Sequence, residues 1–266
     1  MVIIITGASS GIGKALALKY YNKGFNVVLA ARSVEKLIKI QKEFKLSNTK
    51  ILIQKTDVSI KKECEKLIKK TIEKFGEIHI LINNAGISMR SLFIDTDLEV
   101  IEKILQINFL GAVYCTKYAL PYILKEKGSI VGISSIAGHK GLPARTGYSS
   151  SKFALQGFLE SLRTEHLYDG IHVLTACPGF TSSNIRKNAL GKTGQQIGES
   201  SRNENKMMTT EEVANYVYNA IKKRKNSLVL TREGKLTVWL NKFFPNFLNK
   251  LIYNHLAKEH DSPLKK

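Results

Sequence analysis

Tyr148 and Lys152 are the pair of residues in this sequence that is best suited to chemistry. They stand four positions apart in the run Tyr148-Ser149-Ser150-Ser151-Lys152, and this spacing places two side chains on one face of a helix. A neutral phenol has a pKa of about 10, and a fixed ammonium within about 4 to 6 Å favours the phenolate and lowers that value. The pair could therefore exchange a proton with an alcohol or a carbonyl oxygen, although such pairs also occur on helices that only face solvent.

A glycine-rich segment near the start of the sequence could bind a phosphate group. Residues 6–13 read TGASSGIG and lie between an apolar run and a helical pattern. Glycine permits a tight turn and a close approach of the backbone, and a helix N-terminus presents free N–H groups to an anion. The spacing is GxxxGxG rather than GxGxxG, and glycines also serve as structural caps. The position between a strand and a helix favours a nucleotide-binding turn.

Seven short apolar runs that are rich in valine and isoleucine predict the elements that position these residues. The runs are Val2–Thr6, Phe25–Ala30, Ile51–Lys55, Ile78–Ile82, Ser129–Ser134, Ile171–Ala176 and Ser227–Leu230. Their alternation with helical patterns predicts an α/β fold, a Rossmann-type doubly wound parallel sheet of seven strands with helices on both faces. Ligands bind beyond the carboxyl ends of the strands in such sheets, so we expect the chemistry in the segments that follow the runs.

Helical patterns fill the intervals between the predicted strands. They cover Lys14–Lys23, Val34–Lys45, Lys61–Phe75, Leu98–Lys125, Gly147–Tyr168 and Glu211–Lys223. Thr209 and Glu212 offer a capping box to the last of them. Residues 181–208 are polar and too long for an ordinary connection, and we predict that they form a mobile lid over the substrate. The sequence thus divides into a catalytic domain over residues 1–233 and a helical extension over residues 234–266.

Six motifs in this order resemble the classical short-chain dehydrogenases/reductases, over the region from Val2 to about Leu230. The motifs are the TGxxxGxG turn, Asp57-Val58, Asn83-Asn84-Ala85-Gly86, Asn108, Ser135 with Tyr148 and Lys152, and Pro178-Gly179. The resemblance implies an oxidoreductase that interconverts a carbonyl and an alcohol by hydride transfer with a nicotinamide cofactor. It also implies that the cofactor performs the difficult chemistry while the protein binds and orients the reactants.

The resemblance gives four catalytic residues distinct roles. Tyr148 is the general acid and base, and Ser135, rather than Ser134, holds the substrate oxygen. Lys152 holds the nicotinamide ribose and lowers the pKa of Tyr148 through its charge. Asn108 kinks its helix and holds a water that links Lys152 to solvent.

The resemblance also implies a set of residues that contact the cofactor. The set is Gly7, Ser9, Ser10, Gly11, Ile12, Gly13, Arg32, Asp57, Val58, Asn84, Ala85, Gly86, Tyr148, Lys152, Pro178, Gly179, Phe180 and Thr181. Asp57 would contact the adenine, although it could instead cap the helix that follows. Thr181 would lie near the carboxamide, with Ser182 and Ser183 as neighbouring hydroxyls. We expect no metal site.

The end of the second predicted strand bears on the choice between the two nicotinamide cofactors. NAD enzymes place a carboxylate there to bind the ribose hydroxyls, whereas this sequence has Ala31 followed by Arg32. A guanidinium pairs with a 2'-phosphate through charge-assisted hydrogen bonds, so we expect NADP rather than NAD. Ser9 and Ser10 could add hydroxyl donors, but the basic residue that NADP enzymes of the family often carry near them is absent from this sequence.

Composition bounds the partners of the protein. The 266 residues are 43% hydrophobic, which suits a soluble globular protein with a large core. The net charge of +19, from 41 Lys+Arg against 22 Asp+Glu, admits nucleic acid, an anionic membrane or an anionic small molecule as a partner. The lysines are dispersed along helices without a nucleic-acid-reading motif, so we do not expect a nucleic-acid partner. Isolated cysteines and the absence of a signal-peptide pattern predict a cytoplasmic protein, and the resemblance implies a homodimer or homotetramer.

The C-terminal extension carries an amphipathic pattern whose purpose the sequence leaves open. Its apolar positions include Trp239, Phe243, Phe247 and Leu251, and Lys250 lies beside the last of these. The extension could pack on its own domain or on a partner subunit, cover a bulky substrate, or lie on an anionic membrane.

Substrate identity is likewise open. His139 and Arg145 fall between Ser135 and Tyr148, where they could contact a polar substrate or remain exposed loop residues. The alternative functions are a catalytically silent scaffold or sensor that binds NADP, and a reductase of a lipid-like ketone at a membrane surface.

Overall fold

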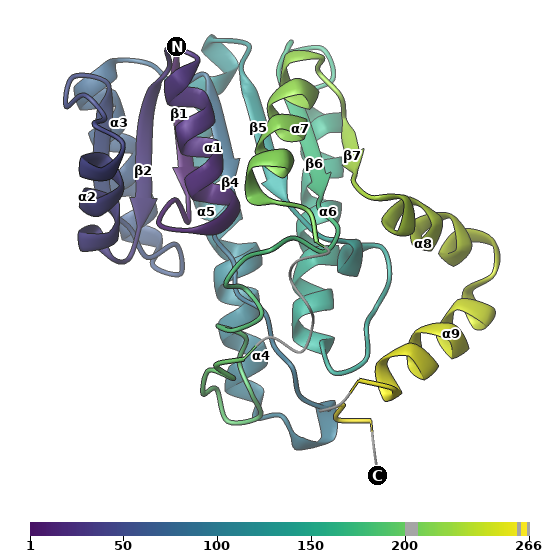
Figure 1. Cartoon of the computed structure of the whole chain (residues 1–266). Coiled ribbons are helices and arrows are strands. Elements are labelled where there is room, and N and C mark those ends of the chain that lie inside the picture. The colour runs from purple at the N-terminus through teal and green to yellow at the C-terminus, as the bar shows by residue number, and fades with distance from the viewer. Residues whose placement is uncertain (200–206, 260–261, 265–266) are drawn as a thin grey trace.

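Seven parallel strands form the central sheet of the computed structural model, which describes residues 1–199, 207–259 and 262–264 (Figure 1). The strands are β1 (Val2–Thr6), β2 (Asn26–Ala31), β3 (Ile51–Lys55), β4 (Ile80–Asn83), β5 (Ser129–Ile133), β6 (His172–Cys177) and β7 (Ser227–Val229). Their spatial order is β3-β2-β1-β4-β5-β6-β7, and neighbouring strands pair in parallel. This arrangement confirms the predicted Rossmann-type fold.

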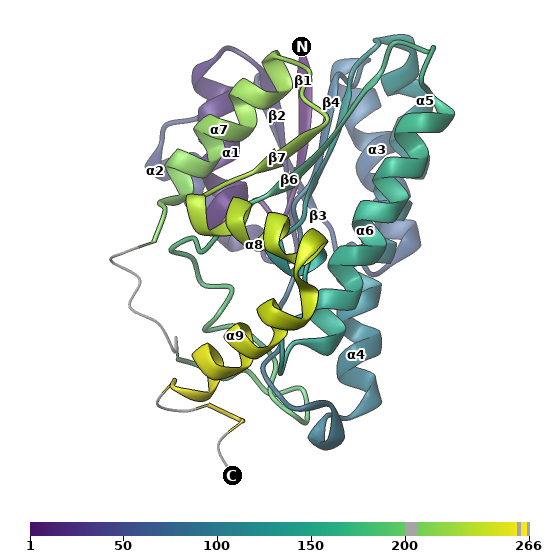
Figure 2. The same cartoon turned by 90° about the vertical axis from the view of Figure 1, so that its right-hand side faces the viewer.

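Helices cover both faces of the sheet (Figure 2). One face carries α1 (Gly11–Asn22), α2 (Val34–Glu43) and α7 (Thr210–Lys222), and the other carries α3 (Lys61–Phe75), α5 (Gly111–Lys125) and α6 (Thr146–Glu165). Short 3-10 turns η1 (Phe93–Asp95) and η3 (Ile136–Gly138) follow β4 and β5. The helix α7 begins with the capping box that the sequence predicts, formed by Thr209 and Glu212.

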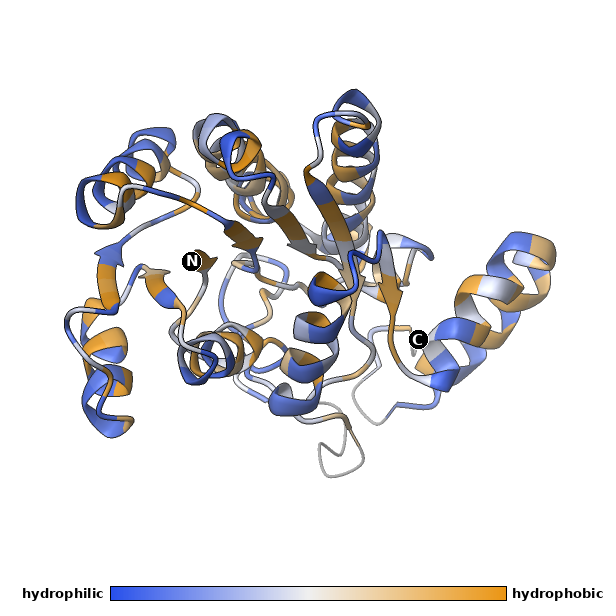
Figure 3. Ribbon diagram, turned by 90° about the horizontal axis from the view of Figure 1, so that it is seen from above, coloured by the Kyte–Doolittle hydropathy of each residue, from blue (hydrophilic) through white to orange (hydrophobic). Residues whose placement is uncertain are grey.

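The apolar runs, largely orange in Figure 3, form strands because helices cover both faces of the sheet. In β1, Ile3 and Ile5 join the core under α1, α2 and α7, whereas Val2 and Ile4 join the core under α3, α5 and α6. All four side chains are fully buried, and burying each contributes roughly 1.5 to 3 kcal/mol. A continuous apolar run is therefore the expected sequence of a strand that is covered on two sides.

The long helix predicted over Leu98–Lys125 is present, but a π-turn interrupts it. The segment consists of α4 (Leu98–Leu105), the π-turn η2 (Gln106–Leu110) and α5. The π-turn accommodates one extra residue within a helical turn, and such turns often occur at functional sites. Asn108 lies in the middle of it.

The segment that the sequence predicts to be a lid is a series of turns where the structure describes it. Its two ends are held together at the base, because Ser182 N donates to Met208 O (2.9 Å) and Met208 N donates to Phe180 O (3.2 Å). Farther along, Leu190 forms bridges with Met89 and with Gln196. Residues 200–206, which belong to the same predicted lid, lie outside the described residues.

The C-terminal extension forms two helices, α8 (Arg232–Phe243) and α9 (Pro245–Ala257), which project from the sheet beyond β7 (Figure 1). Polar contacts fasten them to the domain that precedes them: Asn241 Nδ2 donates to His139 O (2.8 Å), and Arg90 Nη2 pairs with Glu259 Oε2 (2.9 Å). None of the helices in the described part of the chain combines the length and the apolarity that crossing a membrane requires. Residues 260–261 and 265–266 of the extension lie outside the description.

Candidate functional site

The predicted site residues gather at the carboxyl edge of the sheet, around the point where β1 and β4 are neighbours. From β1 the chain proceeds to β2 and β3 on one side, and from β4 it proceeds to β5, β6 and β7 on the other. The order of the strands therefore reverses between β1 and β4, and the carboxyl edge of the sheet at such a switch point is the usual ligand site of an open α/β sheet.

The glycine turn after β1 is pressed against the loop after β4. Gly7 and Gly11 have φ angles of +66° and +55°, which favour glycine. A Cβ atom on Gly7 would come within 2.8 Å of Ala85 Cα, and one on Gly13 would overlap Gly7 O and the Asn84 side chain. Asn84 Nδ2 also donates to Gly7 O (3.2 Å). Close packing of the two backbone segments thus accounts for glycine at positions 7 and 13.

The turn places the N-terminus of α1 at the carboxyl edge of the sheet. Lys14 N donates to Ser10 O (3.2 Å), so the N–H groups of Gly11, Ile12 and Gly13 precede the bonded part of the helix. The Ser10 side chain makes no cap hydrogen bond to α1. These N–H groups and the positive end of the helix dipole suit an anion such as the diphosphate of a dinucleotide.

The residues predicted to contact the adenosine part lie after β2 and β3. Arg32 is exposed at the end of β2. Asp57 Oδ1 accepts hydrogen bonds from Ser59 N (3.0 Å) and Ser59 Oγ (2.6 Å), so this carboxylate organises its own turn. The residue at the cap position of α3 is Ile60, which means that Asp57 does not cap that helix. Val58 is buried and contacts the helix position Gly111.

Asn108 connects the π-turn to two other elements. Its Oδ1 accepts a hydrogen bond from Ile87 N (2.8 Å), and its Nδ2 donates to Ile87 O (2.9 Å) and to Ser151 Oγ (2.9 Å). Gly86 lies directly beside it, since a Cβ there would come within 3.2 Å of Asn108 Oδ1 and 3.5 Å of Lys152 Nζ. Asn108 therefore holds the loop after β4 against the helix that carries Tyr148 and Lys152.

Helix α6 brings Tyr148, Lys152 and Ser135 together. Lys152 Nζ lies 5.7 Å from the centre of the Tyr148 ring and donates to Ile133 O (2.8 Å). Ser135 follows β5, and its Oγ accepts a hydrogen bond from Ala137 N (3.2 Å). That bond leaves the Ser135 proton to be donated, and the Ser135 hydroxyl interacts with the Tyr148 oxygen.

Burial dominates the electrostatics of this group. It raises the pKa of Tyr148 above its ordinary value, against the Ser135 hydrogen bond and the positive charges of Arg145 and Arg186, which lower it. The direction is opposite to the lowering that the Tyr148 and Lys152 spacing alone predicts, because the cost of burying a phenolate outweighs these favourable interactions. Burial also lowers the pKa of Lys152 to about 8.

Cys177 and His139 contact each other near Lys152. His139 Nε2 lies 3.4 Å from Cys177 Sγ, and burial lowers the pKa of His139. Burial raises the pKa of the Cys177 thiol to about 11. The structure excludes the exposed alternative for His139, because its side chain is half-buried against the thiol, and the substrate contact stays a prediction. Ser134 also points away from the site, since its Oγ accepts from Gln156 Nε2 (2.9 Å).

The segment after β6 brings in an arginine that sequence reasoning missed. Thr181 is buried and its Oγ1 donates to Gly179 O (3.1 Å), whereas the Phe180 side chain is exposed. Arg186 is only 8% exposed, and its Nη2 donates to Thr181 O (2.8 Å). A single arginine in an aperiodic polar segment carries no sequence signal, and only its charge could have drawn attention to it.

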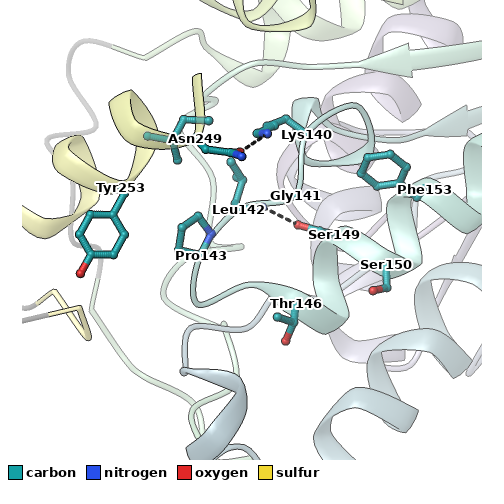
Figure 4. Close-up of a pocket in the computed structure, with 11 residues that line it drawn as sticks. Lys140, Gly141, Leu142, Pro143, Thr146, Ser149, Ser150, Phe153, Asn249 and Tyr253 are labelled. Atoms are coloured by element: carbon teal, nitrogen blue, oxygen red, sulfur yellow. Dashed lines mark hydrogen bonds between the residues drawn. The ribbon is translucent and has the colours of Figure 1, made fainter. Parts of the chain in front are cut away.

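A separate cavity of about 630 Å³ lies between the outer face of α6 and α9 (Figure 4). Its lining includes Leu142, Pro143, Phe153 and Tyr253, while Ser149 Oγ accepts a hydrogen bond from Leu142 N (3.2 Å). The lining does not include Tyr148 or Lys152.

Comparison with known proteins places these features in a family context. The sequence model described as short chain dehydrogenase matches residues 1–193. The chain is 41% identical to human Dehydrogenase/reductase SDR family member 7 over 217 residues, which cover 79% of this chain and 64% of the human protein. The chain thus spans less than two thirds of that relative.

Solved structures share the fold. The structure of a short chain dehydrogenase/reductase from Burkholderia phymatum in complex with NAD superposes with a TM-score of 0.80 at 23% identity, over 91% of this chain and 92% of the other. The structure titled ElxO with NADP bound gives a TM-score of 0.73 at 29% identity, over 85% and 95% of the two chains.

Proposed function

The chain belongs to the short-chain dehydrogenase/reductase family, and on this premise we propose that it is an NADP-dependent oxidoreductase that interconverts a carbonyl and an alcohol. The observation that carries the proposal is the grouping of Tyr148, Lys152 and Ser135 at the carboxyl edge of the sheet, which is also the edge where the glycine turn lies. A scaffold that only binds a nucleotide has no need of this group.

Tyr148 and Ser135 act on the oxygen of the substrate. Burial keeps the phenol protonated at neutral pH because it raises the pKa of Tyr148, and the protonated form is the one that reduction of a carbonyl requires. Ser135 Oγ, oriented by its bond from Ala137 N, donates to the same substrate oxygen. In the oxidation direction Tyr148 accepts the alcohol proton instead.

Lys152 and Asn108 support this proton transfer. The Lys152 ammonium is held by Ile133 O at the end of β5, from where it can donate to ribose hydroxyls. Asn108 fixes the loop after β4 against α6 through Ile87 and Ser151, so it positions the helix face that carries the reactive pair.

The chain fits a nicotinamide dinucleotide, which supplies the hydride when bound. The N–H groups at the start of α1 suit its diphosphate, and the side chain at the end of β2 is Arg32 rather than a carboxylate. An exposed guanidinium at this place favours a 2'-phosphate, which supports NADP. ElxO, at 29% identity, binds NADP, while the Burkholderia protein binds NAD.

Substitution of Tyr148 tests the proposed reaction. We expect Tyr148→Phe to lower kcat by at least about 100-fold, because the variant loses the proton donor, while NADPH binding measured by fluorescence titration stays within about threefold. NADPH consumption would be screened with ketones, aldehydes, oxo acids and oxo-lipids. Persistent turnover in the variant, or wild-type protein that binds NADPH and reduces no carbonyl, would contradict the proposed mechanism.

Substitution of Arg32 tests the proposed cofactor preference. We expect Arg32→Glu to reduce kcat/KM for NADPH by about 10- to 100-fold, because a carboxylate repels the 2'-phosphate and the charge-assisted hydrogen bonds are lost. The value for NADH should fall less than threefold or rise. Arg232→Glu, at an exposed arginine on α8, is the matched control. Equal losses with both cofactors would assign Arg32 to structure instead.

A second proposal, action at a membrane surface, is favoured by one observation on the extension. Seven large hydrophobic side chains of α8, α9 and the residue between them are about half exposed: Leu236, Trp239, Phe243, Phe244, Phe247, Leu251 and Tyr253. Exposed lysines lie among them at positions 235, 242 and 250. Aromatic and basic residues on a short helix suit the interface of an anionic bilayer, and a lipid-like ketone would be a suitable substrate there.

A further inference from the structure

The start of α8 contacts two segments that the proposed reaction uses. Thr231, which caps α8, lies against the segment after β6, since a Cβ atom on Gly179 would come within 2.6 Å of Thr231 Cγ2. Gly234, in the first turn of α8, lies against the residue that follows Ser135, since a Cβ there would come within 2.8 Å of Ile136 Cδ1. The C-terminal extension therefore contacts the domain next to the serine that holds the substrate oxygen.

The backbone at Thr231 fixes the direction in which α8 begins. Its φ and ψ angles are +64° and 150°, and its Oγ1 accepts a hydrogen bond from Gly234 N (3.0 Å). A positive φ is unfavourable for a β-branched residue, and such conformations persist only where the surrounding contacts determine them. The contacts with Gly179 and Ile136 are of this kind, so the first turn of α8 has one defined position against the domain.

A second contact from α8 reaches the far end of the same catalytic turn. Asn241 Nδ2 donates to His139 O (2.8 Å), and His139 directly follows the turn η3 that begins at Ile136. Helix α6 borders η3 as well, because a Cβ on Gly138 would overlap the side chain of Gln156. The turn η3 thus lies between α6 and α8, and α8 contacts it at both ends.

The orientation of Ser135 depends on η3. Ala137 N donates to Ser135 Oγ (3.2 Å), and Gly138 N donates to Ser135 O (3.0 Å). A 3-10 turn of three residues has poor hydrogen-bond geometry and is not stable by itself, so its neighbours must hold it in place. A small displacement of a group that orients the substrate can cost much of the rate.

We propose that α8 holds the catalytic serine in its working position and that Asn241 is the positioning residue that acts through Ser135. This inference rests on the proposed function, since Ser135 matters only where a substrate oxygen is held. The bond from Asn241 fixes the end of η3, while Gly234 leaves room for Ile136 at its beginning. The extension is then required for efficient turnover and not only for the stability of the chain.

Substitution of Asn241 tests the proposal in the full chain. Asn241→Asp keeps the size of the side chain but turns an oxygen toward His139 O in place of the donor. We expect kcat for NADPH-dependent reduction to fall by about 5- to 50-fold, while the Kd for NADPH stays within about threefold. The substrate would be para-nitrobenzaldehyde, or the compound of the carbonyl screen that the wild type reduces fastest.

Two further variants separate the lost donor from a general disturbance. Asn241→Gln keeps an amide donor and should recover most of the kcat that Asn241→Asp loses. Asn249→Asp, on α9, is the matched control, because Asn249 Oδ1 accepts a hydrogen bond from Lys140 Nζ and a carboxylate can accept it as well. Its kcat should stay within about twofold of the wild type. Melting temperatures establish that each variant is folded.

A double-mutant cycle tests whether Asn241 acts through Ser135. In a Ser135→Ala background, measured at high enzyme concentration, Asn241→Asp should lower the residual kcat by less than about twofold, because residues that act as a unit are not additive. The same fold loss in both backgrounds would overturn the proposal, as would an Asn241→Gln that loses as much as Asn241→Asp.

The wild type distinguishes this inference from the function on which it rests. Carbonyl reduction that Asn241→Asp leaves unchanged would overturn the role of Asn241 and leave the oxidoreductase proposal standing. Wild-type protein that binds NADPH and reduces no carbonyl would overturn both.

Discussion

The Lys152 ammonium is a charge that the folded protein carries at a cost. The side chain is 4% exposed, and burial lowers its pKa from 10.5 to about 8. Between these two values the unfolded chain binds more protons than the folded one, so stability rises with pH across that interval. Below about pH 8 the cost is fully present. A charge retained under this penalty is expected where it serves the chemistry rather than the fold.

Replacing this lysine should separate stability from activity. At pH 7, Lys152→Met removes a penalty of up to about 3 kcal/mol, whereas at pH 10.5 little penalty is left to remove. We therefore expect the melting temperature of the variant relative to wild type to be several degrees higher at pH 7 than at pH 10.5, while turnover falls by at least about 100-fold.

The control for this comparison is Lys117→Met, at an exposed position of α5. The melting temperature of Lys117→Met should differ from that of the wild type by the same amount at pH 7 and at pH 10.5. A Lys152→Met difference that does not vary with pH would mean that the ammonium is not destabilising in the folded protein.

Residue spacing made the reactive pair predictable but not its electrostatics. The i and i+4 positions of Tyr148 and Lys152 are visible in the sequence, and a helix places them on one face as expected. The raised pKa of Tyr148 could not be predicted, since it depends on how completely three separate loops and a helix exclude water. The burial of Arg186 could not be predicted either, because it depends on how the segment after β6 folds around the bond to Thr181 O.

At the scale of elements, the apolar runs determined which segments became strands, while the pairing determined where the strands end. The run Ile78–Ile82 is apolar except for His79, yet β4 begins at Ile80, where pairing with Ile3 of β1 starts. His79, just before it, instead accepts a hydrogen bond from Val2 N on its Nδ1 (3.2 Å). A hydrophobic pattern indicates which residues are buried, but it does not indicate which residues of a partner strand they pair with.

The interruption of the long helix and the packing of the C-terminal helices were harder to predict from the sequence. The apolar pattern of Leu98–Lys125 continues through the π-turn, so nothing in its period indicates an extra residue. The amphipathic pattern of α8 and α9 correctly predicted helices but did not indicate what they pack against. In the structure the extension contacts the chain's own domain through Asn241 and Glu259.

At the scale of the whole molecule, the extension combines polar anchorage with apolar exposure. The bonds to His139 and Arg90 fix its inner side, whereas Trp239 and Phe243 remain 52% and 54% exposed. The chain also carries a net charge of +19, which favours approach to an anionic surface. Exposed aromatic groups and a positive field together support the proposed contact with a bilayer.

Vesicle binding tests this contact. We expect the protein to sediment with vesicles that contain phosphatidylserine, less with neutral phosphatidylcholine vesicles, and less in high salt because the lysine contribution is screened. The double variant Trp239→Ser with Phe243→Ser should lose most of the binding, since it removes apolar area that would enter the interface.

The matched control for vesicle binding is Tyr168→Ser, an aromatic residue that is 95% exposed after the end of α6. This variant should sediment as the wild type does. Equal sedimentation of the double variant and the wild type, or none of the wild type with either vesicle, would remove the membrane-surface proposal.

The π-turn at Gln106–Leu110 also bears on which insertions and deletions this gene can tolerate. Each residue of an α-helix advances the chain by about 100° around the axis, so a single-codon deletion here would rotate α4 by about that angle relative to α5. Val100 and Ile104, now in the apolar cluster around Tyr148, would then face elsewhere, while Asn108 would leave Ile87. A deletion that restores an ideal helix would therefore be more damaging than many substitutions in the same segment.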